Sequence, residues 1–404
     1  MKNILFLTLS NFEDIKKNAI YPDLVRTLSN YCEVSVVAPR EKRTGLETEL
    51  SDHGNIKILK VKTGNITKCN NFIEKGISTL RIESQYMKAI RKYFSNIKFD
   101  LVLYSTPPIT FTKIIKHSKQ RQNSKSLLLL KDIFPQNAVD IGLIRNNGLI
   151  HKYFIRKEKS LYAISDRIGC TSENNISFVK MNNPQIDPNK VIICRNSIDP
   201  RPKEYFQKNG HGRRILNISD EATIFLYGGN LGKPQAIDFL LLFIEQFHRV
   251  NNSHLVIIGS GSEYSRIEKF IQENKSKNVV LKSALPKKDY NDIMMDCDVG
   301  LVFLDHRFTV PNNPARFTEY MEASLPMLAA TDKATDTREW LENKRIGFWV
   351  ESKPEFIDEM IEKAQILADD KNLRTEFGNN GRLFLEDKFT VQETARTIID
   401  FIES

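Results

Sequence analysis

The chain has 404 residues, of which 41% are hydrophobic and 27% are charged. These are the proportions of a globular protein, and the length allows two or three domains that each bury a core. No run approaches the roughly 18 apolar residues that span a bilayer, and the apolar run within residues 1–8 is too short for a signal peptide. The net charge of +9 favours anionic partners, but no nucleic-acid-binding motif accompanies it. We therefore expect a cytoplasmic protein whose partners include phosphorylated ligands and no nucleic acid.

The five cysteines are odd in number and form no C-x-x-C pair. This pattern argues against a zinc site and for a reducing compartment. Cys32, Cys170 and Cys194 lie at the edges of apolar runs, where we expect free buried thiols.

In the first half of the chain, short apolar runs alternate with amphipathic segments. The expected strands are residues 4–7, 34–38, 56–61, 101–104, 126–130, 167–170 and 191–194. Helices are expected between most of them, for example at 77–94 and 149–163. This alternation predicts a parallel sheet covered by helices.

A polar, irregular stretch at 196–220 separates this half from a second alternation. Expected strands are 223–227, 255–258, 279–282, 299–304, 327–330 and 348–350; expected helices are 236–250, 264–274, 288–296, 315–323 and 338–343, with helical segments from 355 to the end. We predict an α/β protein with two Rossmann-like doubly wound domains, residues 1–198 and 213–385, facing a central cleft at the carboxyl ends of their strands. A last helix within 386–404 is expected to pack back toward the first domain.

A glycine-rich segment follows the strand expected at 223–227. It reads Gly228-Gly229-Asn230-Leu231-Gly232-Lys233. Glycines let the backbone approach a ligand closely, and Lys233 supplies a positive charge for phosphate. The spacing is neither that of a Walker A loop nor G-x-G-x-x-G, so the segment alone is also consistent with a simple turn.

A second segment, Asn312-Asn313-Pro314-Ala315-Arg316-Phe317-Thr318-Glu319, predicts a helix N-terminus. Asn313 suits the N-cap position and Pro314 the first helical position. The free amides and the positive end of the helix dipole would attract a diphosphate, and Glu319, one turn on, could accept the hydroxyls of a ribose. The alternative is that Arg316 and Glu319 form an ordinary surface ion pair three residues apart.

The order of these motifs, with Gly259-Ser260-Gly261 between them, resembles the GT-B retaining glycosyltransferases of family 4. Within that family the sequence is most similar to the bacterial branch that builds O-antigen and capsule, such as N-acetylfucosamine transferases. Three further segments match in the right order: 105–108, 132–135 and 194–199. The resemblance covers most of the chain.

The resemblance implies transfer of a sugar, with retention, from a UDP-sugar to a lipid-linked saccharide without a metal cofactor. Lys233 and Arg316 would hold the diphosphate and, with Asp132, serve catalysis. Asp132 would contact the transferred sugar, and Glu319 the donor ribose. The nucleotide-sugar site would also include Gly229, Asn230, Gly232, Gly259, Asn313 and Phe317.

The sequence departs from the family at three places. Pro311 stands where a second glutamate is usual, Ser324 replaces a glycine, and residues 10–14 replace a glycine-rich turn after the first strand. The family's contact to the hydroxyls of the donor sugar and its acceptor specificity therefore cannot be assigned to this sequence. Two rival functions remain: a nucleotide-sugar epimerase on the same fold, and a non-catalytic nucleotide-sugar-binding subunit.

Two features outside these motifs have alternative interpretations. Asp296-Cys297-Asp298 spells D-x-D, a metal-binding pattern in another glycosyltransferase fold, but an aspartate before a strand is also common. Residues 149–162 form a basic amphipathic helix with apolar residues at 150, 154 and 161. That helix either binds the anionic inner face of the plasma membrane peripherally or packs on the sheet with a solvated polar face.

Overall fold

The computed structural model describes residues 1–10, 12–66 and 72–404, so Cys69 and Asn11 lie outside the described residues. The chain divides into two compact units. The first unit comprises residues 1–199 and 389–404, and the second comprises residues 200–388.

The first unit is built on an eight-stranded sheet with the order β3-β4-β2-β1-β5-β6-β7-β8. All neighbouring strands are parallel except β3 and β4. The strands are β1 (Lys2–Leu7), β2 (Cys32–Glu41), β3 (Glu49–Asp52), β4 (Ile56–Thr63), β5 (Leu101–Ser105), β6 (Lys125–Leu130), β7 (Arg167–Cys170) and β8 (Val191–Ile193). Strand order reverses between β1 and β5, so this unit is doubly wound.

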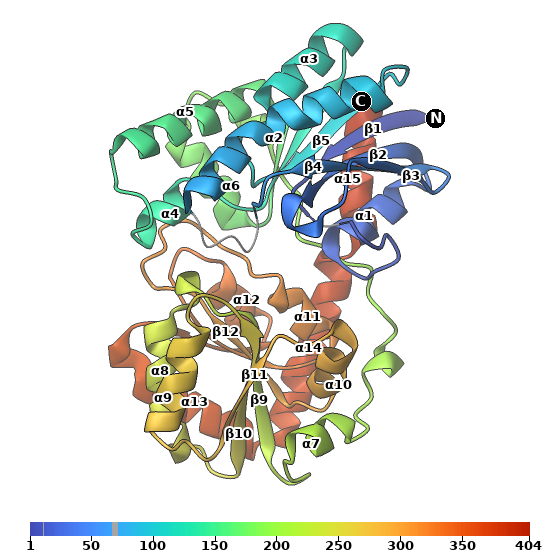
Figure 1. Cartoon of the computed structure of the whole chain (residues 1–404). Coiled ribbons are helices and arrows are strands. Elements are labelled where there is room, and N and C mark those ends of the chain that lie inside the picture. Colours follow the sequence, from blue (N-terminus) through green and yellow to red (C-terminus); the bar gives the residue numbers. More distant parts are fainter. Residues whose placement is uncertain (11, 67–71) are drawn as a thin grey trace. The chain divides into compact units, whose positions relative to one another are not determined.

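The helices of the first unit cover its sheet (Figure 1). They are α1 (Ile20–Leu28), α2 (Phe72–Tyr93), α3 (Thr112–Gln122), α4 (Gln136–Asp140), α5 (Leu149–Ile164), α6 (Glu173–Asn182) and α15 (Val391–Glu403), with short 3-10 helices η1 (Lys42–Thr44) and η2 (Pro188–Lys190). The last helix, α15, contacts α1, and its Val391, Ala395 and Ile398 are buried in the same core as β1 and β2. The end of the chain is therefore part of the first unit.

The second unit contains a six-stranded parallel sheet with the order β11-β10-β9-β12-β13-β14. Its strands are β9 (Thr223–Asn230), β10 (Ser253–Ser260), β11 (Val279–Ser283), β12 (Val299–Phe303), β13 (Met327–Thr331) and β14 (Gly347–Glu351). Every residue of β12 and β13 is buried, as expected when helices cover both faces of a parallel sheet. The switch point of this unit lies between β9 and β12, where ligands of doubly wound sheets bind.

Figure 1 shows α8 (Ile237–Gln246), α9 (Tyr264–Glu273) and α13 (Ile357–Asp369) on one side of this sheet, and α10 (Lys287–Met295) and α11 (Arg316–Glu322) on the other. The remaining helices are α7 (His211–Leu216), α12 (Thr337–Asn343) and α14 (Lys371–Lys388), with 3-10 helices η3 (Lys203–Phe206), η4 (Lys233–Gln235), η5 (Phe247–Arg249) and η6 (Pro354–Phe356). A core of apolar residues from β9, β10, β12, α8 and α13 lies under the first of these layers.

All thirteen strands expected from the sequence are present, with ends shifted by at most three residues. The sequence did not predict the antiparallel strand β3, whose residues are mostly exposed and so lack a continuous apolar pattern. It was also wrong to treat all of residues 196–220 as irregular, because α7 forms there.

Two other sequence expectations concern the cysteines and the membrane. Cys32, Cys170, Cys194 and Cys297 are buried free thiols. Among the described residues, no helix is both long enough and apolar enough to cross a bilayer.

Candidate active site

The carboxyl end of β9 is the centre of the candidate site in the second unit. The strand extends through both glycines, so Gly228 and Gly229 belong to β9 and not to the turn that the sequence predicted. A Cβ atom at Gly228 would lie 2.0 Å from Tyr290 Oη, and one at Gly229, where φ is 130°, would lie 3.1 Å from Arg316 Nη2. Gly228 therefore has no room for a side chain beside the Tyr290 phenol, and Gly229 has a φ that favours glycine.

Arg316 is the first residue of α11, and its guanidinium carbon lies 4.2 Å from the centroid of the Tyr227 ring. Such stacking holds the planar group in place. Its Nη1 atom is buried and has no hydrogen-bond partner among the described residues. A buried donor of this kind is costly unless a ligand uses it, so Arg316 offers a positioned cation to an anion.

The helix that the sequence placed at Asn313 begins later, at Arg316, with Ala315 as its N-cap. Asn313 is therefore not the N-cap, and Pro314 precedes the helix. The carbonyl of Pro314 already accepts a 3.0 Å hydrogen bond from the amide of Phe317. The Phe317 amide is thus not free for phosphate, and the Phe317 ring packs against Trp340 with ring centroids 5.7 Å apart.

Glu319 forms its ion pair with Lys287 of α10, at 2.6 Å, and both side chains are partly exposed. The alternative interpretation, a surface pair between Arg316 and Glu319, is therefore wrong. The carboxylate remains accessible at the start of α11, one turn beyond Arg316.

The turn after β9 is held by Gln235, whose Oε1 accepts hydrogen bonds from Asn230 Nδ2 (2.8 Å) and the Gly232 amide (3.3 Å). This fixes the backbone on which Lys233 begins η4. Lys233 is exposed and forms no ion pair with any described residue. Gly259 of β10 has a packing reason to be glycine, because a Cβ there would lie 1.9 Å from the carbonyl oxygen of Gly229.

Sequence reasoning missed three residues of this site: Lys287, Tyr290 and Tyr320. Lys287 and Tyr290 are three residues apart on α10 and so share one helix face. The Tyr320 hydroxyl accepts a hydrogen bond from the Gly228 amide (3.1 Å) and donates one to the Leu226 carbonyl (3.0 Å). Tyr320 lies within the segment 312–323 that the sequence singles out, but the sequence assigned it no role, because the roles of all three residues depend on the approach of α10 and α11 to β9.

In the first unit, Asp132 follows β6 at the carboxyl end of the sheet. Its backbone amide and carbonyl both engage the Thr106 hydroxyl, at 3.3 Å and 3.1 Å. The carboxylate has neither a hydrogen bond nor an ion pair with a described residue, and burial raises its pKa to about 6. Asp132 is therefore a positioned, un-neutralised carboxyl group.

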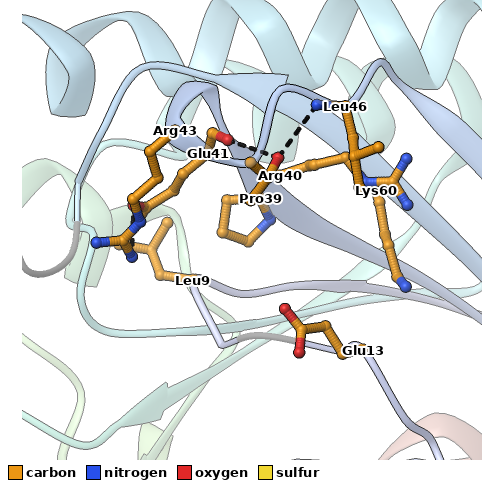
Figure 2. A pocket seen from close by; sticks show the side chains of 9 residues that line it. Leu9, Glu13, Pro39, Arg40, Glu41, Arg43, Leu46 and Lys60 are labelled. Carbon is orange, nitrogen blue, oxygen red and sulfur yellow. Dashed lines mark hydrogen bonds and ion pairs between the residues drawn. The ribbon is translucent and has the colours of Figure 1, made fainter.

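A pocket of about 340 Å³ lies near the carboxyl ends of β1 and β2 in the same unit (Figure 2). Its charged lining comprises Glu13, Arg40, Glu41, Arg43 and Lys60. Arg40 pairs with Glu49 and Arg43 with Glu41, whereas Lys60 forms no ion pair within the part of the chain that the structure describes. Figure 2 shows the carboxylate of Glu13 directed toward Leu9 and Pro39. A small pocket with charges of both signs suits a hydroxyl-rich ligand.

The D-x-D carboxylates have structural partners. Asp296 accepts hydrogen bonds from the amides of Asn209, Gly210 and Gly212, and Asp298 pairs with Lys208 and Arg213. These contacts anchor the segment that leads into the second unit. Residues 1–10, 12–66 and 72–404 contain no group of three or more His, Cys, Asp or Glu side chains arranged to hold a metal ion.

Comparison with known proteins connects this geometry to a family. Residues 211–384, which include β9 and α11, match the model of the "Glycosyl transferases group 1" family. The chain is also 22% identical over 286 residues to the probable glycosyltransferase WbjE of Pseudomonas aeruginosa, covering 69% of this chain and 68% of WbjE.

Solved structures share the fold over the whole chain at low sequence identity. A sucrose-phosphate synthase from Thermosynechococcus elongatus is 16% identical with a TM-score of 0.77, covering 100% of this chain and 98% of that one. HepE of Anabaena, in complex with UDP-glucose, is 12% identical with a TM-score of 0.68 and full coverage of both chains. WaaG, a glycosyltransferase involved in lipopolysaccharide biosynthesis, is 13% identical with a TM-score of 0.66, covering 98% of this chain and 99% of WaaG. The chain is therefore a glycosyltransferase with the GT-B fold, and its residues 211–384 match the model of the glycosyl transferases group 1 family.

Proposed function

We propose that the chain transfers a sugar from a UDP-sugar to a lipid-linked saccharide, with retention at the anomeric carbon, in the synthesis of a surface polysaccharide. The observation that carries the donor assignment is the Arg316 guanidinium, fixed on Tyr227 against Gly229 with a buried donor atom unused. A diphosphate supplies the anionic oxygens that such a group binds. The UDP-glucose complex of HepE supports a UDP-sugar as the donor.

The role of each residue follows from its position. Arg316 and the exposed Lys233 neutralise the diphosphate as it leaves, and the Glu319 carboxylate accepts hydrogen bonds from the ribose. Because charge on the leaving group grows in the transition state, the cations contribute more to turnover than to donor affinity. Gly229, Asn230 and Gly232 supply close backbone approach, with Gly259 supporting Gly229 from the neighbouring strand.

In the proposed reaction the bond between the anomeric carbon and the β-phosphate oxygen breaks, and an acceptor hydroxyl oxygen bonds to that carbon on the same face. The hydroxyl proton passes to an oxygen of the departing diphosphate, so no further reactant is needed. Asp132 contacts the transferred sugar as a carboxylate, which favours positive charge at the anomeric carbon. We propose a UDP-linked N-acetylated deoxyhexose as the first donor to test, on the resemblance of the sequence motifs alone.

The acceptor is proposed to bind the first unit, in the pocket of Figure 2, whose charges suit sugar hydroxyls. The similarity to WaaG, whose role is in lipopolysaccharide biosynthesis, supports a surface glycan such as O-antigen or capsule.

We further propose that α5 attaches the enzyme to the anionic inner face of the plasma membrane. Ile150, Phe154 and Leu161 share one helix face, but exposure falls along it: Ile150 is 63% exposed, Phe154 half-buried and Leu161 fully buried. The start of the helix therefore projects apolar side chains, including Leu149 at 87% exposure, while its end packs on the unit. The nearby cations Lys152, Arg156, Lys157 and Lys159 form no ion pairs with described residues and would favour anionic lipids.

Calorimetry with UDP and a transfer assay test the proposal together. Glu319→Ala should weaken UDP binding at least tenfold, since a charge-assisted hydrogen bond contributes about 1.5–3 kcal/mol, while the melting temperature stays within a few degrees. Glu342→Ala, which removes an exposed carboxylate from α12, is the matched control and should bind UDP normally.

The same transfer assay tests metal independence. We expect full activity in EDTA, because Arg316 and Lys233 neutralise the diphosphate. Loss in EDTA that manganese or magnesium restores, or unchanged UDP affinity in Glu319→Ala, would contradict the corresponding part of the proposal.

A further inference from the structure

The hydroxyl group of Tyr290, on α10, lies against Gly228 near the carboxyl end of β9. The ring and Oη fill the space that a side chain at Gly228 would need, with Oη 2.0 Å from the Cβ position. Oη is buried and has no hydrogen-bond partner among the described residues. Burial also raises the pKa of this phenol well above its usual value, so it is a hydrogen-bond donor at any pH of interest.

Tyr320 explains why Tyr290 has no partner within the fold. The Tyr320 hydroxyl uses both the amide of Gly228 and the carbonyl of Leu226. The amide of Gly228 and the carbonyl of Leu226 therefore each have a partner other than Tyr290. A buried hydroxyl left unsatisfied costs about 1–3 kcal/mol, and side chains that bear such a cost are concentrated at binding sites.

We propose that Tyr290 donates a hydrogen bond to the diphosphate of the nucleotide-sugar, making α10 a second wall of the donor site opposite the contribution of α11. This rests on the proposed function and deepens it. Tyr290 lies against Gly228 and Arg316 against Gly229, so two side chains that each have an unused donor atom lie against neighbouring residues of β9, whose Cα atoms are about 3.8 Å apart. A diphosphate presents several anionic oxygens over this span.

The Lys287–Glu319 ion pair connects ribose binding to Tyr290. Lys287 Nζ lies 2.6 Å from Glu319 Oε1 and 5.2 Å from the centroid of the Tyr290 ring. One ammonium group thus contacts both the carboxylate proposed for the ribose and the face of the Tyr290 ring.

Tyr290→Phe separates this role from a structural one, because the two have opposite signs. The substitution removes only an unsatisfied hydroxyl, so the melting temperature without ligand should stay equal or rise. Affinity for UDP, measured by calorimetry, should fall about tenfold, and the fall should be smaller for UMP, which lacks the second phosphate. Tyr320→Phe is the matched control: it removes two hydrogen bonds within the fold and should lower the melting temperature.

The outcomes distinguish the inference from the proposed function. A wild-type chain that binds no nucleoside diphosphate contradicts the proposed function itself. If the wild type binds UDP and Tyr290→Phe binds it equally well, only the inference is overturned. A melting temperature lowered as in Tyr320→Phe, or equal losses for UDP and UMP, would also overturn it, because the hydroxyl would then serve the fold or the nucleoside.

Discussion

The two units share a doubly wound parallel sheet but present opposite chemistry at its carboxyl edge. In the second unit, two side chains that lie against β9 each have a buried hydrogen-bond donor without a partner among the described residues, namely Arg316 Nη1 and Tyr290 Oη. In the first unit, the unused group after β6 is the carboxyl group of Asp132. One sheet edge thus suits an anion and the other suits positive charge.

This difference shows that the shared fold sets where a ligand binds, at the carboxyl edge of the sheet, and that the side chains there determine which charge it can carry. The un-neutralised groups are costly in the free chain, because burial raises the pKa of Asp132 and leaves Arg316 Nη1 without a partner. A buried carboxylate of the second unit, that of Asp332, is instead satisfied within the fold. Asp332 also has its pKa raised to about 6 by burial, yet it accepts hydrogen bonds from the amides of Ala334 and Thr335.

The largest effect should come from Arg316. Arg316→Ala is expected to lower the turnover number about 100- to 1000-fold, because its guanidinium group stabilises charge that develops on the leaving diphosphate. UDP affinity should fall much less. Steady-state transfer kinetics and calorimetry measure the two quantities. Arg338→Ala is the control, since Arg338 also stacks on an aromatic ring, that of Trp349 at 5.0 Å, and should leave turnover unchanged. If the turnover number fell equally in both variants, Arg316 would have no special role in transfer.

Asp132→Asn should lower transfer about 100-fold and stabilise the fold. The native pKa, about 6, is above the ordinary value of 3.8, so the native state binds the proton more tightly than the unfolded state. Stability contributed by this group therefore falls as pH rises between about 4 and 6, and the full cost, on the order of 3 kcal/mol, is present above pH 6. The melting temperature of the variant should exceed that of the wild type at pH 8 and match it near pH 4.

Asp332→Asn sharpens this comparison between the units. Asp332 has a similar pKa, but its carboxylate forms three hydrogen bonds with the loop that follows β13. We expect this variant to be stabilised less at pH 8 than Asp132→Asn, because an amide in place of the carboxylate loses the hydrogen bond from the Thr335 hydroxyl. If the two variants had equal gains in melting temperature, the contacts of Asp332 would make no difference between the two carboxyl groups.

The smallest effect on turnover should come from α5. Replacing Lys152, Arg156, Lys157 and Lys159 with glutamine should lower partition onto anionic vesicles at least tenfold, since each cation near the surface contributes about 1 kcal/mol that salt screens. Transfer to a water-soluble acceptor should be unchanged. Vesicle co-sedimentation at low and high salt measures the partition.

A control with the same loss of charge in the second unit replaces Lys269, Lys275, Lys277 and Lys288, which are exposed. This variant should keep its vesicle binding. If both variants bind vesicles equally, the attraction of the protein to the vesicle depends on net charge alone, and α5 only packs on the sheet.

The sequence by itself determined the two alternating halves and nearly all of their strands. Continuous apolar runs report burial on both faces of a parallel sheet, and this local pattern is sufficient to locate a strand such as 299–303. Local patterns also identified Arg316, Glu319 and the glycines of β9 as candidates. They failed at the start of α11, where Asn313 and Pro314 resemble a cap and a first helical residue, yet the chain begins the helix at Arg316.

Only the tertiary structure decided which groups are satisfied and which are left for a ligand. Glu319 pairs with Lys287 and not with its helix neighbour Arg316, and Tyr290 fills the space that Gly228 leaves. These partners come from different helices, brought together by the order of the strands around the switch point. Hydrogen-bond satisfaction depends on atoms within about 3 Å in space, and no spacing along the chain encodes that. The sequence therefore located the site, and the packing of α10 and α11 against β9 determined its chemistry.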